Sequence, residues 1–271
     1  MSKNLLLKAG GTGALILALV ILFFPKQAAS QRNIVLNMPN YDQELFHFGF
    51  VLGVNQSFVT IRPIANLNSY TFTRSYMPED ILPTPDSARV LSVTARSIPG
   101  FVISILANMR MGDHFDLRFL PSLAFGDRTL EYNIRTFTAI PGGTDSALFT
   151  KTKKVPSTYI SFPLEIRYKA FRYNNFRPYL LVGAQYSLDL ASNAKKREAK
   201  NRDEKIVKFN ASDFYAEAGV GFDFYNEWFK FGVELKMMYG FLDVLKHENN
   251  IYTESIEKLN SKIFQLSLTF E

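Results

Sequence analysis

WFKFGVELKMMYGF, residues 228–241, alternates apolar side chains with polar or small ones along its whole length. One parity is apolar from Phe229 to Phe241, and the other carries Lys230, Glu234 and Lys236 among small residues. Successive side chains of a β-strand point to opposite faces of the sheet. The stretch is therefore predicted to be a strand with one continuously apolar face and one charged face.

The same alternation recurs along the chain after residue 45. Together with residues 228–241 it predicts eight strands, which span residues 46–58, 98–110, 114–126, 158–170, 178–190, 214–225, 228–241 and 262–270. Each has roughly the 9 to 11 residues, or slightly more, that a tilted strand needs to cross a bilayer. The least regular is 98–110, where Val102 and Leu106 fall on the polar face.

The lengths of the connections distinguish a membrane barrel from a soluble one. Those after the second, fourth and sixth strands are short, whereas residues 59–96, 127–156, 191–211 and 242–261 form long connections after the others. Soluble sandwiches and lipocalin-like barrels also alternate in polarity. Strict alternation of short and long connections favours an all-β fold, an eight-stranded antiparallel up-and-down transmembrane β-barrel with short periplasmic turns, long extracellular loops and both termini in the periplasm.

The N-terminus has the features of an export signal. Lys3 and Lys8 precede an apolar run over residues 14–24, and Ala28, Ala29 and Ser30 offer a cleavage site between Ser30 and Gln31. An uncleaved anchor helix is the alternative, but this run is short for a hydrocarbon layer of about 30 Å. The predicted organisation is a signal peptide at 1–30, a periplasmic N-terminal segment at 31–45 and a barrel domain at 46–271, in the bacterial outer membrane.

Composition excludes several kinds of site and makes a nucleic-acid partner unexpected. The chain has no cysteine, which excludes disulfides, thiolate metal sites and a cysteine nucleophile. Its formal charge of +6 includes Lys3, Lys8 and Lys26 of the predicted signal peptide. The mature chain is therefore only mildly basic, and we expect no nucleic-acid partner.

The polar parity of the predicted strands places charges of both signs inside the barrel. Eight strands enclose a space that side chains just fill, and buried charges persist when they are paired. We expect an ion-pair network that closes the interior; a proton or ion path is the alternative. Its predicted members are Arg110, Asp116, Arg118, Glu165, Arg167, Lys169, Glu217, Asp223, Glu234 and Lys236.

No catalytic or cofactor site is predicted. The three histidines, His47, His114 and His247, fall on different parts of the chain, and His247 with Glu248 lacks further metal ligands at suitable spacing. The chain is therefore not expected to be an enzyme, the alternatives being a lipid A-modifying barrel or a small barrel for a hydrophobic ligand. A basic cluster in the third long connection could contact lipopolysaccharide phosphates or be merely solvated: Lys195, Lys196, Arg197, Lys200, Arg202 and Lys205.

Three stretches resemble one known family. They are NMPNYDQELFHFGFVLGVN at 37–55, residues 99–132 with their core LRFLPSLAFGDRTLEY, and STYISFPLEIRYKAFRYNNFRPYLLVGAQYSLDLAS at 157–192. They are similar to the PorT family of outer-membrane barrels, which is associated with type IX secretion and gliding motility in Bacteroidetes-type bacteria. The resemblance implies a non-enzymatic accessory or assembly role in protein secretion. Its partners would be other secretion-system proteins, besides outer-membrane lipid and lipopolysaccharide.

Overall fold

The computed structural model describes residues 35–190 and 207–271. The predicted signal peptide with its cleavage site at Ser30 and Gln31 lies outside the described residues. So does the basic cluster of Lys195, Lys196, Arg197, Lys200, Arg202 and Lys205. Among the described residues, no helix has the length and apolar character needed to cross a membrane.

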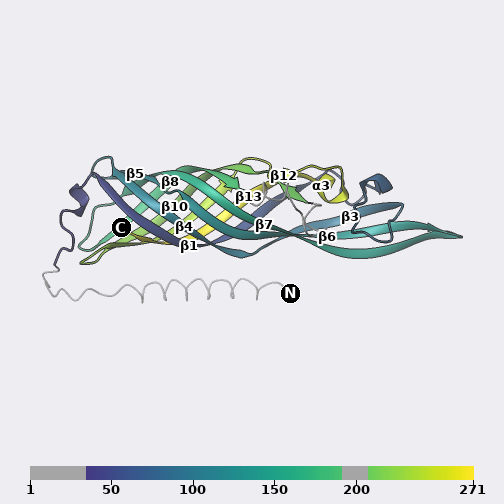
Figure 1. Cartoon of the computed structure of the whole chain (residues 1–271), viewed down its shortest axis with the longest axis horizontal. Coiled ribbons are helices and arrows are strands. Elements are labelled where there is room, and N and C mark those ends of the chain that lie inside the picture. The colour runs from purple at the N-terminus through teal and green to yellow at the C-terminus, as the bar shows by residue number, and fades with distance from the viewer. Residues whose placement is uncertain (1–34, 191–206) are drawn as a thin grey trace, which may run out of the picture. The chain divides into compact units, whose positions relative to one another are not determined.

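Antiparallel strands form a closed ring (Figure 1). The ring runs in the order β1, β13, β11, β10, β8, β7, β5 and β4, and β4 pairs with β1 to close it. Its members are β1 (Phe46–Pro63), β4 (Pro99–Arg110), β5 (Phe115–Phe119), β7 (Gly143–Lys169), β8 (Phe176–Asp189), β10 (Ser212–Tyr225), β11 (Lys230–Gly240) and β13 (Ile256–Phe270). The predicted eight-stranded antiparallel barrel is confirmed.

Two strands of the ring continue past a short break. β3 (Ser87–Ser97) precedes β4 with one residue between them, and β6 (Ser122–Ile140) follows β5 after Leu120 and Pro121. Proline lacks the N–H group that a ladder needs, which accounts for the break at Pro121. Minor elements are β2 (Phe72–Thr73), β9 (Lys208–Phe209), β12 (Leu245–Lys246), the 3-10 helices η1 (Tyr41–Gln43) and η2 (Arg74–Tyr76), and the helix α3 (Ile251–Glu254).

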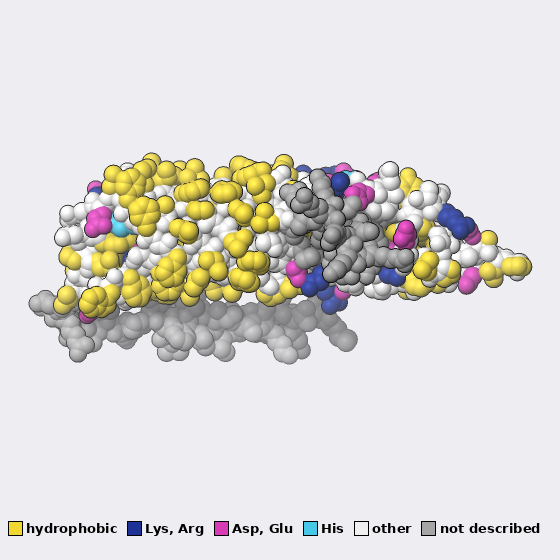
Figure 2. Space-filling view, in the orientation of Figure 1, with side chains coloured by type: hydrophobic (Ala, Val, Ile, Leu, Met, Phe, Trp, Pro, Cys, Tyr) yellow, Lys and Arg dark blue, Asp and Glu magenta, His cyan; other side chains and the backbone are white. Residues whose placement is uncertain are grey.

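The apolar face of the ring points outward. Leu164 is 51% exposed, whereas its neighbour Glu165 is fully buried. Phe50 and Phe270, which are register partners on β1 and β13, stack on this outer face with ring centroids 4.9 Å apart. Figure 2 shows the hydrophobic side chains covering the barrel portion of the visible face. Such an arrangement suits a lipid surrounding, because it exposes large apolar groups and buries charges.

The two ends of the ring differ, and we call them the turn end and the loop end. The turn end carries the β4–β5, β7–β8 and β10–β11 connections, the segment before β1 and the C-terminal residue. At the loop end, β6 and β7 continue together as a hairpin whose last register pair is Ile140 with Gly143. Gly142, in the turn between them, has φ of +96°, a conformation that glycine adopts without strain.

The segments 59–96 and 127–156, predicted as long connections between strands, themselves contain strand. β1 extends to Pro63, Ser87–Ser97 forms β3, and the whole of 127–156 except the hairpin turn is strand. Leu130, Tyr132 and Ile134 are buried at alternate positions of β6, so the period-two pattern was present there. The strands were predicted too short, because they continue beyond the region in which their outward side chains are apolar.

A hydrophobic core fills the interior at the loop end. It brings together the extended strands and the segments around β9, β12 and α3. Its buried members are Phe72, Ile81, Ala88, Val90, Leu130, Tyr132, Ile134, Val155, Val207, Phe209, Val244, Leu245, Ile251, Tyr252, Ile256 and Leu259. The molecule therefore has an apolar interior at the loop end and a charged interior toward the turn end.

Candidate functional site

The charged interior is organised around Arg118 of β5. Its guanidinium lies 2.7 Å from Glu234 and 3.3 Å from Glu165, carboxylates of β11 and β7. Lys236 contacts the same two carboxylates, at 2.6 Å from Glu165 and 3.4 Å from Glu234. The Tyr179 hydroxyl donates a 2.9 Å hydrogen bond to Glu234. These contacts join four strands across the interior of the ring.

A second set of ion pairs lies closer to the turn end. Arg167 contacts Asp116 at 2.6 Å and Asp223 at 3.1 Å. Lys169 also pairs with Asp116, at 2.6 Å. Lys230 lies 3.8 Å from Asp223 and 2.8 Å from Glu271, the last residue of the chain. Each buried charge in this set therefore has an opposite charge beside it, as burial of charge requires.

The structure places nine of the ten predicted residues in the buried interior. The exception is Arg110, which ends β4 and pairs instead with exposed Asp113 at 2.6 Å in the β4–β5 turn. Glu217 is buried, but neither of its carboxylate oxygens accepts a hydrogen bond from the described residues. Lys230 and Glu271 belong to the arrangement but were not predicted. Lys230 lies on the charged parity of its strand, so that signal was available.

The segment before β1 closes the turn end of the barrel. The Tyr41 ring stacks on His47 with centroids 3.9 Å apart, and its hydroxyl donates a 2.8 Å hydrogen bond to Glu271. Burial and the neighbouring Glu271 carboxylate raise the pKa of Tyr41, which keeps the hydroxyl a donor. The backbone N–H of Asn37 donates to the side chain of Asn175, 2.9 Å away. The chain entering the barrel is thus fixed across its mouth.

Asp42 provides the ionic part of this closure. Its two carboxylate oxygens accept hydrogen bonds of 2.7 and 2.9 Å from Arg177, and the Tyr225 hydroxyl donates another at 3.1 Å. Arg172 lies 3.6 Å from the same carboxylate and 3.6 Å above the Tyr225 ring. Burial alone would raise the pKa of Asp42, but Arg177 and Tyr225 outweigh it and lower the pKa. The carboxylate is therefore ionised at neutral pH.

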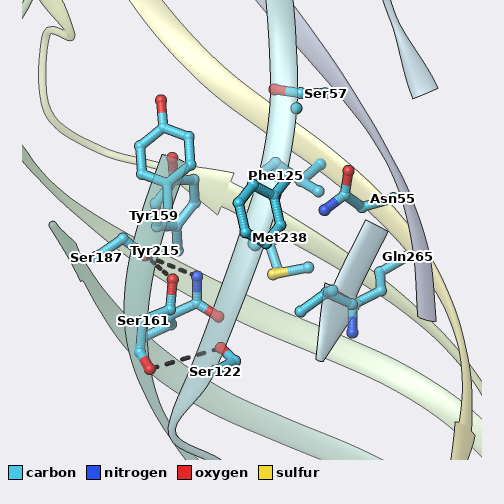
Figure 3. A pocket seen from close by; sticks show the side chains of 15 residues that line it. Asn55, Ser57, Ser122, Phe125, Tyr159, Ser161, Ser187, Tyr215, Met238 and Gln265 are labelled. Carbon is cyan, nitrogen blue, oxygen red and sulfur yellow. Dashed lines mark hydrogen bonds between the residues drawn. The ribbon is translucent and has the colours of Figure 1, made fainter. Parts of the chain in front are cut away.

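A small cavity lined by polar and apolar side chains lies inside the barrel (Figure 3). Its volume is about 30 Å³, and its lining includes Asn55, Gln185, Tyr215 and Gln265. The Ser161 and Ser187 hydroxyls form a 2.8 Å hydrogen bond beside it. A cavity of this size is large enough to hold a water molecule.

The three histidines lie apart. His47 donates a 2.8 Å hydrogen bond to the Tyr41 backbone oxygen, and His114 donates one of 3.0 Å to the Lys169 backbone oxygen, both at the turn end. His247 is at the loop end, 3.4 Å from Asp243 and 3.9 Å from Glu254. Its described partners are carboxylates rather than a nucleophile. Within residues 35–190 and 207–271, no group of three acidic or histidine side chains could hold a metal ion.

Comparisons with known proteins bear on the fold and family. A family model described as outer membrane protein beta-barrel domain matches residues 27–246. No curated protein matches the sequence. The crystal structure of the outer membrane protein OprG from Pseudomonas aeruginosa is similar with a TM-score of 0.33 and 12% identity, over 84% of this chain and 95% of that one. The family assignment therefore rests on the match of residues 27–246 to the family model.

Proposed function

The chain belongs to the family of outer membrane protein beta-barrel domains and lies in the bacterial outer membrane, and from that premise we propose that it is a non-enzymatic accessory protein that supports protein secretion. It acts through contacts with other secretion components and does not conduct cargo itself. The resemblance of residues 37–55, 99–132 and 157–192 to the PorT family supports a type IX system, with gliding motility as a possible dependent process.

The filled interior is the observation that carries this proposal. Arg118, Glu165, Glu234 and Lys236 tie the three strands β5, β7 and β11 together across the ring, and the hydrophobic core occupies the loop end. Breaking such buried pairs costs about 3–5 kcal/mol each time one partner is removed. A protein whose interior is closed this firmly at rest is best suited to act through its surfaces.

Two surfaces are available for such contacts. One is the turn end, where the segment before β1 lies across the mouth in the periplasm. The other is the β6–β7 hairpin at the loop end, where the apolar side chains of Ile140 and Leu148 are 50% and 63% exposed. The first is held in place by the ion pair of Asp42 with Arg177, and the second by the continuous pairing of β7 with β6.

Deletion of the gene with measurement of cargo secretion and colony spreading tests the proposal. We expect both to fall, and to return when the full chain is supplied again. Complementation with a chain in which residues 137–146 are replaced by a two-residue Asn-Gly turn then tests the hairpin surface. Heat-modifiable gel mobility confirms that this shortened barrel folds. Unchanged secretion in the deletion strain would refute the proposed role.

A matched variant separates contact from conduction. Arg118→Ser combined with Glu234→Ser removes a buried pair of charges without leaving either one alone. If the protein acts through its surfaces, this double variant restores secretion as well as the natural chain, provided that it folds. A barrel that conducts substrate would instead show altered secretion or increased uptake of small solutes.

A further inference from the structure

Three cations lie on the outward face of the barrel directly above its apolar surface. Phe264, Leu266 and Leu268 of β13 point outward, and Lys262 and Lys258 continue the same parity toward the loop end. On the neighbouring strand β1, the register pairs Phe58 with Lys262 and Arg62 with Lys258. We call Arg62, Lys258 and Lys262 the outer basic patch.

Lys262 marks the boundary between the apolar surface and this patch. Its register partners are Phe58 on β1 and Tyr239 on β11, both outward and partly exposed. The ammonium group lies 5.9 Å from the centroid of the Tyr239 ring. A lysine whose stem lies between aromatic rings at the edge of an apolar surface places its charge at the level of lipid headgroups.

The cations of the patch are incompletely neutralised. Arg62, whose side chain is 70% exposed, lies 3.2 Å from Glu257. Neither Lys258 nor Lys262 has a carboxylate within 4.0 Å among the residues that the structure describes. Two other cations of the loop end have carboxylate partners: Lys154 lies 2.8 Å from Asp127, and Lys246 lies 3.4 Å from Glu248. The patch therefore presents free positive charge toward the membrane surface.

We propose that the outer basic patch binds the phosphate groups of lipopolysaccharide in the outer leaflet. The loop end faces outward from the cell, because barrels of the outer membrane have short periplasmic turns and longer extracellular loops. Alternate residues of a strand are about 6.7 Å apart, so Lys262 and Lys258 lie roughly 13 Å apart along β13 and offer charge at two depths. A glycolipid that carries more than one phosphate can use both. The assignment does not depend on the secretion role.

The test uses the purified full-length barrel in vesicles of phosphatidylethanolamine. One set contains lipid A with its phosphates and the other lipid A from which they have been removed, and bound lipid A is counted by native mass spectrometry. The variant is Lys258→Gln with Lys262→Gln, which keeps side-chain length. The control is Lys154→Gln with Lys246→Gln, which removes two cations that have carboxylate partners. Heat-modifiable mobility verifies folding of both.

We expect the natural chain and the control to retain phosphorylated lipid A, and the patch variant to bind it roughly tenfold or more weakly, in line with the strength of basic residues at anionic membrane surfaces. High salt should reduce the difference. Equal binding by the patch variant and the natural chain would overturn the proposal. So would equal retention of dephosphorylated lipid A. Displacement of lipid A by an equal concentration of inorganic phosphate would assign the patch to the free anion instead.

Discussion

The guanidinium of Arg167 and the carboxylate of Asp116 face each other across the β5–β7 pair, with two nitrogens donating to one oxygen at 3.1 and 2.6 Å. Both side chains are almost completely buried, and Asp223 completes the arrangement from β10. The contact thus links β5, β7 and β10 near the turn end.

Arg167→Met is expected to destabilise the barrel by about 3–5 kcal/mol, because Asp116 and Asp223 would lose their shared partner while staying buried. Unfolding by urea in vesicles, followed by the fluorescence of the single tryptophan Trp228, measures this loss. Arg96→Met is the control, since Arg96 pairs with Glu131 while 73% exposed. Its effect should stay below about 1 kcal/mol. Equal effects of the two substitutions would contradict the prediction.

Two buried glutamates are expected to respond oppositely to neutralisation. Glu165 lies between Arg118 and Lys236, whereas the oxygens of Glu217 have no hydrogen-bond partner among the described residues. Glu165→Gln leaves buried cations undercompensated and should cost about 3 kcal/mol or more. Glu217→Gln keeps the size of this buried side chain and breaks no described bond, so stability should rise or change by less than about 1 kcal/mol.

Thermal unfolding of both variants in the same detergent at neutral pH checks this difference. Far-ultraviolet circular dichroism first confirms that each retains its strands. A loss of stability in Glu217→Gln as large as that in Glu165→Gln would show that Glu217 has an ionic role that its described contacts do not reveal.

Parity on the strands predicted which charges face inward, but not how they pair. The alternation in 228–241 is sufficient to turn Glu234 and Lys236 to the interior, because side-chain direction on a strand is a local property. The partners of Glu234 are Arg118 and Tyr179, which lie on β5 and β8. Such pairings depend on the register and stagger of the closed ring, and local sequence does not specify these.

The ends of strands were the least predictable part of the site. Arg110 shares the parity of the interior charges, yet it is the last residue of β4 and reaches the turn instead. Tyr41 and Asp42 lie before the first strand, where no alternation indicates direction. Their roles arise from contacts with Glu271 and Arg177, which are distant in sequence and meet them only because the ring closes.

Gly221→Ala is expected to disrupt the packing of Tyr179. A Cβ atom at residue 221 would overlap the Tyr179 ring, so the ring would have to move and its hydroxyl would leave Glu234. We expect a loss of about 1–3 kcal/mol from overpacking. Urea unfolding measures the loss, and Gly126→Ala is the control, because a Cβ there would be 3.5 Å from its nearest atom. A Gly221→Ala barrel as stable as the control would contradict this account.

Asp80→Asn is expected to loosen the loop end without unfolding the barrel. Asp80 accepts hydrogen bonds from Lys153 at 2.6 Å and from the Tyr252 hydroxyl at 2.9 Å, which hold the segment between β2 and β3 against β7 and α3. Limited proteolysis should cut residues 77–86 several-fold faster in the variant. Heat-modifiable mobility should be unchanged, since these contacts lie outside the ring. Equal cleavage rates in variant and natural chain would refute the role of this contact.

Asp42→Asn is expected to release the segment before β1 from the turn end. The substitution removes the charge that Arg177 and Arg172 neutralise, a loss of about 1.5–3 kcal/mol for hydrogen bonds to a charged group. A spin label at Glu44→Cys reports the release, because Glu44 is exposed and the chain has no other cysteine. The label should be markedly more mobile in the variant at neutral pH. Asp113→Asn, at an exposed ion pair in the nearby β4–β5 turn, is the control and should leave the label immobile.

The contacts of Asp42 also predict that the segment before β1 docks less firmly at low pH. In the docked segment the pKa of Asp42 is held below its ordinary value, because Arg177 and Tyr225 outweigh the effect of burial. Above about pH 4, the ordinary range of an aspartate, docked and free segments are both ionised, so the contact has its full strength. As the pH falls through the lower pKa of the docked segment, Asp42 binds a proton. The free energy that its ion pairs contribute to docking is then lost. The label on the natural chain should therefore become mobile below about pH 4, while the Asp42→Asn chain, mobile throughout, should not respond. Immobile label at low pH in a folded barrel would show that the hydrogen bonds of Tyr41 and Asn37 alone hold the segment.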